Sequence, residues 1–212
     1  VMQNGQARRS LYCYRRRVGC ILIPMFLGLT AHRNFGVALN LRPRIAVIGG
    51  GASGIFAAIA ASEIRDGRGP PLVTVLEATS QTLQKVKISG GGRCNVLHDT
   101  SKSVPTLLAG YPRGKKELNG LFHKHFTPTM AREWFESRGV TLKTEEDGRM
   151  FPITDSSQTI LDTLLDAAKG QGVEICTKHK VTKIVPLERG GFRLELKDET
   201  HQDYQAVILA TG

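Results

Sequence analysis

The chain has 212 residues, of which 41% are hydrophobic, so it is long enough to bury one globular core. Its formal net charge of +10 is concentrated in residues 1–44, which contain eight arginines and no acidic residue. Removing these eight from the 29 basic residues leaves 21 against 19 acidic residues, so the remaining chain is almost neutral. Because its charges are interspersed rather than gathered in a basic stripe, nucleic acid is not expected as a partner of the core.

Residues 1–43 form a basic leader that we expect to lie outside the folded domain. Three arginines at residues 15–17 precede an uncharged, apolar run at residues 18–31. This run is shorter than the roughly 20 residues of a transmembrane helix, so no stable membrane span is expected. The composition suits a transit peptide for a mitochondrion or plastid; a secretory signal and an incorrect gene boundary are alternatives. Without targeting, the protein would be cytoplasmic.

The four cysteines argue against a metal site. No two of them form a CxxC pair, and none forms a ligand set with histidines at zinc spacing; they are Cys13, Cys20, Cys94 and Cys176. A reduced, intracellular protein without a bound metal is therefore the simpler expectation.

The folded part is expected to begin with a buried strand. Residues 45–48 form a short apolar run, and residues 55–64 form an alanine-rich helical segment. Between them lies the pattern G-x-G-x-x-G in its required setting of strand, turn and helix. This turn, here named the first glycine loop, consists of Gly49, Gly50, Gly51, Ala52, Ser53 and Gly54.

The spacing of this loop predicts a dinucleotide site. Gly49 permits the tight turn, Gly51 lets a pyrophosphate approach the helix N-terminus, and Gly54 lets the helix pack close to the strand. A second strand at residues 72–76 ends at Glu77, 23 residues after Gly54, where an acid can accept hydrogen bonds from a ribose hydroxyl. The carboxylate disfavours a ribose 2′-phosphate. The alternative is a structural glycine turn with Glu77 at a strand edge.

A second glycine-rich segment at residues 85–95 reads KVKISGGGRCN. Its three consecutive glycines expose backbone N–H groups, and the guanidinium of Arg93 can make two hydrogen bonds to a phosphate. An NAD-binding Rossmann unit normally continues directly to its third strand. This segment therefore bears on the choice between FAD and NAD, which the first glycine loop leaves open.

Three features farther along the chain have simple structural explanations. His123 and His125 are two residues apart, so a helix would point them in different directions rather than toward one metal. The carboxylates at residues 145–147 adjoin a turn, which is typical of a solvated surface. The basic residues 113–116 are expected to form a loop, although they could receive an anionic substrate.

Capping and turn residues predict the remaining elements. Thr127 and Pro128 suit the N-cap and first position of a helix that runs to residue 139. Asp147 and Gly148 predict a hairpin between strands at residues 141–145 and 149–153. Asp155 is expected to cap a helix that ends near residue 170. Further strands are predicted at residues 173–177, 181–187, 192–196 and 206–209, with the middle two joined as a hairpin.

At this point the sequence resembles the BaiN/YhiN-type flavoproteins, an aminoacetone-oxidase-like family of NAD(P)/FAD-dependent oxidoreductases. The resemblance covers about residues 45–212 and rests on the first glycine loop, Glu77, residues 85–95, GRMFP at 148–152 and ATG at 210–212. It implies FAD as the cofactor, NAD(P)H as a candidate electron donor and an unknown small molecule as substrate. The cofactor-binding residues that it implies are Gly49, Gly51, Ala52, Ser53, Gly54, Glu77, Lys85, Gly91, Gly92, Arg93, Cys94, Val181, Thr211 and Gly212.

The resemblance implies different roles for these residues. The first glycine loop and Glu77 would hold the ADP half of FAD, while residues 91–93 would lie along the pyrophosphate toward the flavin. Residues 211–212 would approach the nucleotide, and Val181 would touch the adenine through its backbone. Cys94 would be a thiol near the flavin or, as we expect, a small buried residue without a redox role.

The expected fold is α/β, a Rossmann-like FAD-binding domain of the glutathione-reductase type at residues 44–212, with an inserted β-hairpin or meander. Members of the family continue into a substrate domain and a return to the FAD domain, so we expect a truncated domain and assign no catalytic acid or base. The alternatives are an NAD-dependent dehydrogenase, which uses the same βαβ unit, and a non-catalytic nucleotide-binding fragment. The sequence does not indicate an oligomeric state.

Overall fold

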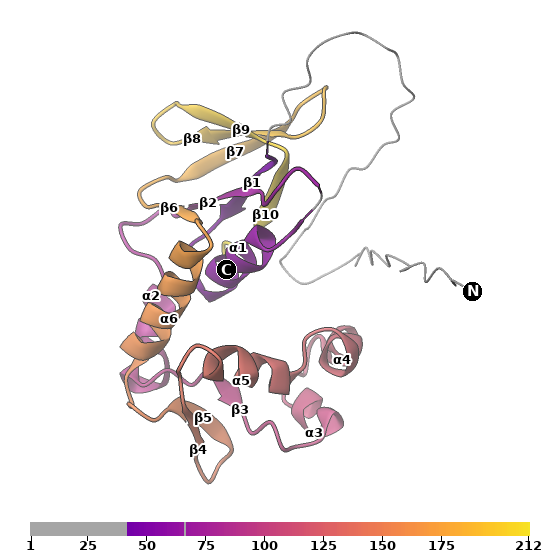
Figure 1. Cartoon of the computed structure of the whole chain (residues 1–212), viewed down its shortest axis with the longest axis vertical. Coiled ribbons are helices and arrows are strands. Elements are labelled where there is room, and N and C mark those ends of the chain that lie inside the picture. Colours follow the sequence, from indigo (N-terminus) through magenta and orange to yellow (C-terminus); the bar gives the residue numbers. More distant parts are fainter. Residues whose placement is uncertain (1–41, 66) are drawn as a thin grey trace, which may run out of the picture.

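The computed structural model describes residues 42–65 and 67–212, which form three sheets and six α-helices (Figure 1). The expected basic leader up to residue 41, with its proposed transit peptide, lies outside the described residues. In the described part of the chain, no helix is both long enough and apolar enough to cross a membrane.

The central sheet is parallel and has the strand order β10-β1-β2-β6. Its strands are β1 (Arg44–Ile48), β2 (Leu72–Leu76), β6 (Glu174–Cys176) and β10 (Ala206–Leu209). In the register of this sheet, Val47 lies beside Val75 on one side and beside Ile208 on the other. The apolar runs of the sequence form these strands because both faces of the sheet are buried. The predicted Rossmann-like fold is confirmed.

Each face of the central sheet has its own hydrophobic core. On one face, side chains such as Val47 and Val75 pack with α1 (Ala52–Ser62) and α6 (Ser157–Gly170). On the other face, Ala46 and Leu76 pack against an antiparallel meander. Alternate residues of one strand thus serve opposite cores, as the two-residue period of a strand requires.

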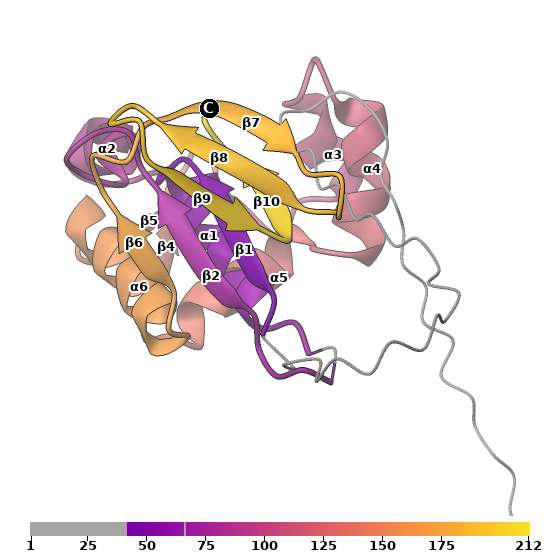
Figure 2. The same ribbon diagram turned by 90° about the horizontal axis from the view of Figure 1, so that it is seen from above.

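The meander consists of β7 (Val181–Pro186), β8 (Phe192–Leu196) and β9 (His201–Tyr204), inserted between β6 and β10. Figure 2 shows it lying over the central sheet. Tyr204, which is 1% exposed, and Leu194, which is fully buried, anchor it there. The sequence predicted the hairpin of β7 and β8, but it did not predict β9.

A third, small sheet lies on the far side of α1 and has the order β3-β5-β4. Its strands are β3 (Leu97–His98), β4 (Leu142–Thr144) and β5 (Arg149–Pro152), and the predicted β4–β5 hairpin is present. The helix α5 (Pro128–Glu136) packs nearby. Its N-cap is Thr127, whose side chain accepts a hydrogen bond from the N–H of Met130, so the predicted cap is confirmed.

The structure corrects the predicted cap of α6. Ser156, not Asp155, caps this helix by accepting a hydrogen bond from the N–H of Gln158. Asp155 has a φ of +50°, and its carboxylate pairs with Lys143 instead. A carboxylate that has a lysine partner in the neighbouring hairpin is drawn away from the helix end.

The expected loop at residues 113–116 is also corrected, because Lys115 and Lys116 form the first turn of a helix. This helix is α4 (Lys115–Lys124), and it packs on α3 (Val104–Ala109). Neither helix was predicted, nor was α2 (Gln84–Ile88), which leads into the 3-10 turn Ser89–Gly92. Short helices without a buried apolar stripe leave a weak sequence pattern.

Candidate nucleotide-binding site

The first glycine loop follows β1 and lies against the turn at residues 210–212. The N–H of Gly49 donates to the carbonyl of Leu76 at 2.9 Å, and Gly49 has a φ of +109°. A Cβ atom at this position would lie 2.3 Å from the carbonyl oxygen of Ala210. Only glycine fits, because both the backbone conformation and the space exclude a side chain.

The two later glycines of the loop meet opposite surroundings. A Cβ atom on Gly54 would lie 1.9 Å from the carbonyl oxygen of Gly49, so Gly54 sets how closely α1 approaches the loop. A Cβ atom on Gly51 would meet nothing within 4 Å. Gly51 is the N-cap of α1, and the first backbone bond of this helix is donated by Ile55. The N–H groups of residues 52–54 therefore lie at the positive end of the helix, where residues 51–53 are exposed.

Glu77 ends β2 next to this loop, and its carboxylate is already oriented. Its Oε2 accepts a hydrogen bond from the N–H of Gly50 at 2.7 Å, and Oε1 accepts from the N–H and the hydroxyl of Thr79, both at 2.8 Å. Burial would raise the pKa of Glu77, but these donors outweigh it and hold the pKa below its ordinary value of 4.5. The carboxylate is thus ionised at neutral pH and keeps acceptor capacity for a ligand hydroxyl.

Thr79 is a functional candidate that the sequence reasoning missed. It fixes the rotamer of Glu77 through two hydrogen bonds from a position two residues later. Threonine and serine often bond to groups two residues away, so the spacing E-x-T was an available signal.

The structure brings two distant segments to the edge of this loop. The segment before β7 lies beside Glu77, because the N–H of His179 donates to the Glu77 carbonyl at 2.8 Å. Val181, the first residue of β7, follows two residues later. At residues 211–212, a Cβ atom on Gly212 would lie 3.6 Å from Nζ of Lys85 on α2. The side chain of Lys85 therefore lies close to the turn at residues 211–212.

The second glycine segment forms a turn, Ser89–Gly92, here named the second glycine turn. Gly90, Gly91 and Gly92 have φ values of +57°, +68° and +87°. Cβ atoms on Gly91 and Gly92 would meet nothing within 4 Å. Successive backbone N–H groups in left-handed conformations form concave surfaces that suit anions.

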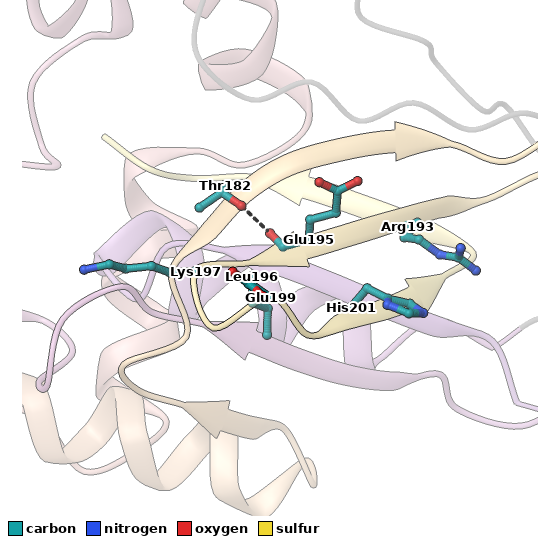
Figure 3. Close-up of a pocket in the computed structure, with 7 residues that line it drawn as sticks. All are labelled: Thr182, Arg193, Glu195, Leu196, Lys197, Glu199 and His201. Atoms are coloured by element: carbon teal, nitrogen blue, oxygen red, sulfur yellow. Dashed lines mark hydrogen bonds between the residues drawn. The ribbon is translucent and has the colours of Figure 1, made fainter.

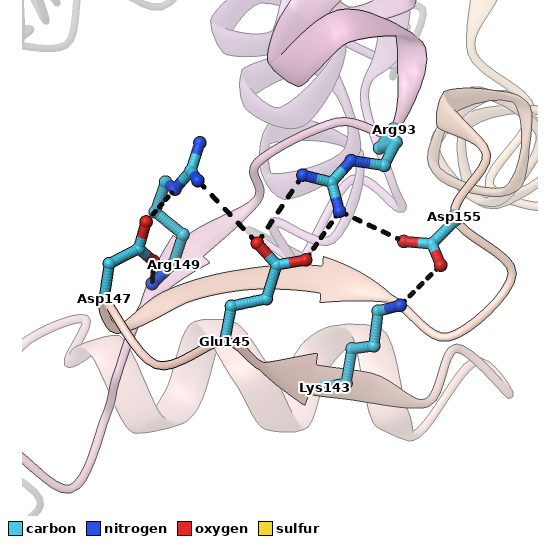
Figure 4. A network of polar contacts seen from close by, with 6 residues as sticks. All are labelled: Arg93, Lys143, Glu145, Asp147, Arg149 and Asp155. Atoms are coloured by element: carbon cyan, nitrogen blue, oxygen red, sulfur yellow. Dashed lines mark hydrogen bonds and ion pairs between the residues drawn. The ribbon is translucent and has the colours of Figure 1, made fainter.

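Arg93 follows this turn, but its guanidinium points to the β4–β5 hairpin. Its Nη1 atom lies 2.5 Å from Oε1 of Glu145 and 3.5 Å from Oδ1 of Asp155 (Figure 4). Its Cζ atom lies 4.0 Å from the centroid of the Phe151 ring. From the sequence, Glu145 was expected on the solvated surface, and Phe151 was named only as part of the GRMFP motif.

Cys94 is 5% exposed and belongs to the hydrophobic core next to α1. Burial raises the pKa of its thiol above the ordinary value of 9.0. A protonated, buried thiol favours the structural role that we expected for Cys94 over a reactive one.

Two surface hollows lie away from the first glycine loop. One, of about 510 Å³, lies on the meander and is lined by residues of both charges (Figure 3). The Thr182 hydroxyl there donates to the Glu195 carbonyl at 3.0 Å. The other is formed by residues 144–147. Within residues 42–65 and 67–212, no cluster of three or more histidine, cysteine or acidic side chains could hold a metal ion.

Comparisons with known proteins agree with this architecture. The chain is 31% identical over 169 residues to a 3-dehydro-bile acid delta(4,6)-reductase from Clostridium scindens; the match covers 80% of this chain and 39% of that protein. The chain thus spans about two fifths of the length of this relative.

Solved structures share the fold at low identity. The quinol fumarate reductase FrdA of E. coli matches with a TM-score of 0.58 at 17% identity, over 81% of this chain and 33% of that chain. A 3-ketosteroid-delta4-(5alpha)-dehydrogenase from Rhodococcus jostii matches with a TM-score of 0.51 at 14% identity, over 84% of this chain and 46% of that one. Residues 43–212 match the family described as HI0933-like protein Rossmann domain. The chain therefore belongs to the HI0933-like family, the BaiN/YhiN-type group that its motifs resemble.

Proposed function

We propose that residues 43–212 bind FAD and form part of a flavoprotein oxidoreductase that acts on a small molecule. One observation carries this proposal. The carboxylate of Glu77 is bonded to the N–H of Gly50 at 2.7 Å and so lies against a glycine loop that is open at Gly51. A fixed ribose acceptor beside an open helix N-terminus is what the ADP half of a dinucleotide requires.

The residues of this chain would bind the two halves of FAD differently. The N–H groups of Ala52, Ser53 and Gly54 would bind the pyrophosphate, and Glu77 would accept from the ribose. The backbone of Val181 would border the adenine, since its segment lies beside Glu77. Five residues would lie toward the flavin, namely Lys85, Gly91, Gly92, Thr211 and Gly212. Gly49 would let the first glycine loop pack closely against Ala210.

When bound, FAD supplies the hydride or electron transfer, while the protein binds, orients and shields it. The reductase relative supports a reducing role, and NAD(P)H is the electron donor that we propose. The substrate is proposed only as a small molecule, because this chain covers 39% of that relative.

The test is direct cofactor binding by the intact gene product. We expect the purified protein to carry the visible absorbance of oxidised flavin, or to acquire it when FAD is added after stripping. Titration with NAD serves as the comparison, because an NAD-dependent dehydrogenase would use the same βαβ unit. A colourless protein that binds NAD and takes up no FAD would overturn the proposal.

A further inference from the structure

The second glycine turn has few contacts of its own. All three of its glycines have positive φ, and neither α2 nor the turn contains a buried residue. Gly91 and Gly92 face open space. The N–H of Cys94 closes the turn by donating to the Ser89 carbonyl at 2.9 Å, and contacts with the rest of the protein lie at Gly90 and at Arg93.

Both ends meet the same buried ring. Phe151, in β5, is fully buried. Its Cε1 atom would lie 2.9 Å from a Cβ atom on Gly90, and its face lies 4.0 Å from Cζ of Arg93. The turn thus rests on the β4–β5 hairpin at one end, and the guanidinium stacks on the same ring at the other.

The ion pairs of Arg93 complete this attachment. Glu145 faces the guanidinium fork with both oxygens, at 2.5 Å from Nη1 and 3.5 Å from Nη2, and Asp155 lies at 3.5 Å (Figure 4). These carboxylates also have cationic partners on the hairpin. Arg149 lies 3.7 Å from Glu145, and Lys143 pairs with Asp155. The hairpin therefore presents fixed acceptors to Arg93.

The charges around Arg93 do not suit a phosphate. The connected side chains are Arg93, Lys143 and Arg149 with Glu145, Asp147 and Asp155, three cations and three anions. The network is neutral, and two carboxylates would lie close to any anion that bound the guanidinium. Repulsion between like charges opposes such binding.

We propose that Arg93 is a positioning residue, which holds the second glycine turn in its FAD-binding geometry by joining it to Glu145, Asp155 and Phe151 of the hairpin region. It does this in place of a direct contact with the pyrophosphate. The inference rests on the proposed FAD binding. A turn that is fixed before FAD arrives loses less conformational freedom when it binds, and this preorganisation raises affinity.

The test compares Arg93→Gln, Glu145→Gln and the double variant in the intact gene product. FAD affinity is measured by quenching of flavin fluorescence after removal of bound cofactor. We expect each single variant to weaken FAD binding by roughly three- to tenfold, and the double variant to be no worse than the poorer single one. Glu146→Gln is the matched control, because it removes the same charge from an exposed neighbour and should leave affinity unchanged.

A direct phosphate contact predicts a different pattern. Arg93→Gln would then weaken binding, whereas Glu145→Gln would leave it unchanged or strengthen it by freeing the guanidinium. That result overturns the inference. So does a loss of affinity in Glu145→Gln that is accompanied by a large fall in the melting temperature of the FAD-free protein, since this marks general destabilisation.

Hydrogen exchange in the FAD-free protein separates this inference from the proposed function. Glu145→Gln should speed amide exchange at residues 89–94 and leave β1 and β2 unchanged. If exchange at residues 89–94 is unaffected, Arg93 does not hold the turn through Glu145, and the inference fails even where FAD binds normally. A wild-type protein that takes up no FAD overturns the proposed function, and with it the role in FAD binding, whatever the exchange pattern.

Discussion

Replacing either of two helical glycines, Gly54 or Gly120, by alanine should change stability in opposite directions. Gly54 is in the first turn of α1, and Gly120 is in the middle of α4. Alanine is the better helix former at both positions by about 1 kcal/mol, because glycine loses more backbone entropy. The surroundings of the added methyl group therefore decide which variant becomes more stable.

The structure gives the size of the difference. A Cβ atom on Gly54 would lie 1.9 Å from the carbonyl oxygen of Gly49 and 3.4 Å from Cβ of Ala210. The closer atom is backbone, so it cannot rotate away, and α1 must shift. Such overpacking costs about 1–3 kcal/mol, and a contact of 1.9 Å to backbone belongs in the upper part of this range. After the helix gain of about 1 kcal/mol is subtracted, we expect Gly54→Ala to destabilise the protein by about 1–2 kcal/mol. A Cβ atom on Gly120 would meet nothing within 4 Å, so Gly120→Ala should gain about 0.5–1 kcal/mol.

Denaturant unfolding of the FAD-free protein measures both effects, and the wild-type chain is the common reference. Thermal unfolding should follow, at about 2–4 °C for each kcal/mol in a domain of this size. A Gly54→Ala variant as stable as Gly120→Ala would contradict the predicted clash, because the first glycine loop would then have room that the structure does not show. Gly54→Ala should also weaken FAD binding by displacing the N-terminus of α1.

Three further predictions concern the same loop and Glu77, which accepts a hydrogen bond from it. Gly51→Ala should lower the free energy of unfolding by no more than about 1 kcal/mol, because alanine is a poorer N-cap than glycine but the site is open. It should also weaken FAD binding, and normal FAD affinity would remove Gly51 from the pyrophosphate site. Glu77→Ala should weaken FAD binding by roughly 10- to 150-fold, since a charge-assisted hydrogen bond contributes about 1.5–3 kcal/mol, and an unchanged Kd would contradict the ribose contact. Because folding lowers the pKa of Glu77, its stabilising effect is complete above the ordinary value of 4.5 and disappears as the pH falls through the lower folded value. Urea unfolding between about pH 3 and 6 should therefore show that the free energy of unfolding falls less with acidification in Glu77→Gln than in wild type. The same dependence of this free energy on pH in both proteins would count against the lowered pKa.

The sequence by itself determined the elements whose signals are local. The apolar run at residues 45–48, the glycines after it and the acid at residue 77 predicted strand, loop and second strand where the structure has them. Thr127 followed by Pro128 predicted the start of α5, and Asp147 followed by Gly148 predicted the turn of the β4–β5 hairpin. These features depend on local backbone conformation and on the periods of about 2 residues in strands and about 3.6 residues in helices. Neighbouring residues are enough to encode both.

Tertiary structure alone decided which side chains meet. Arg93 and Glu145 are 52 residues apart, and only the packing of the second glycine turn on β5 brings them within 2.5 Å. The same contact region gives Asp155 a lysine partner and leaves the cap of α6 to Ser156. Arginine beside three glycines has the same local pattern whether it faces a phosphate or a carboxylate. The choice depends on charges that distant elements bring to its surroundings, and these are fixed only when the sheets pack together.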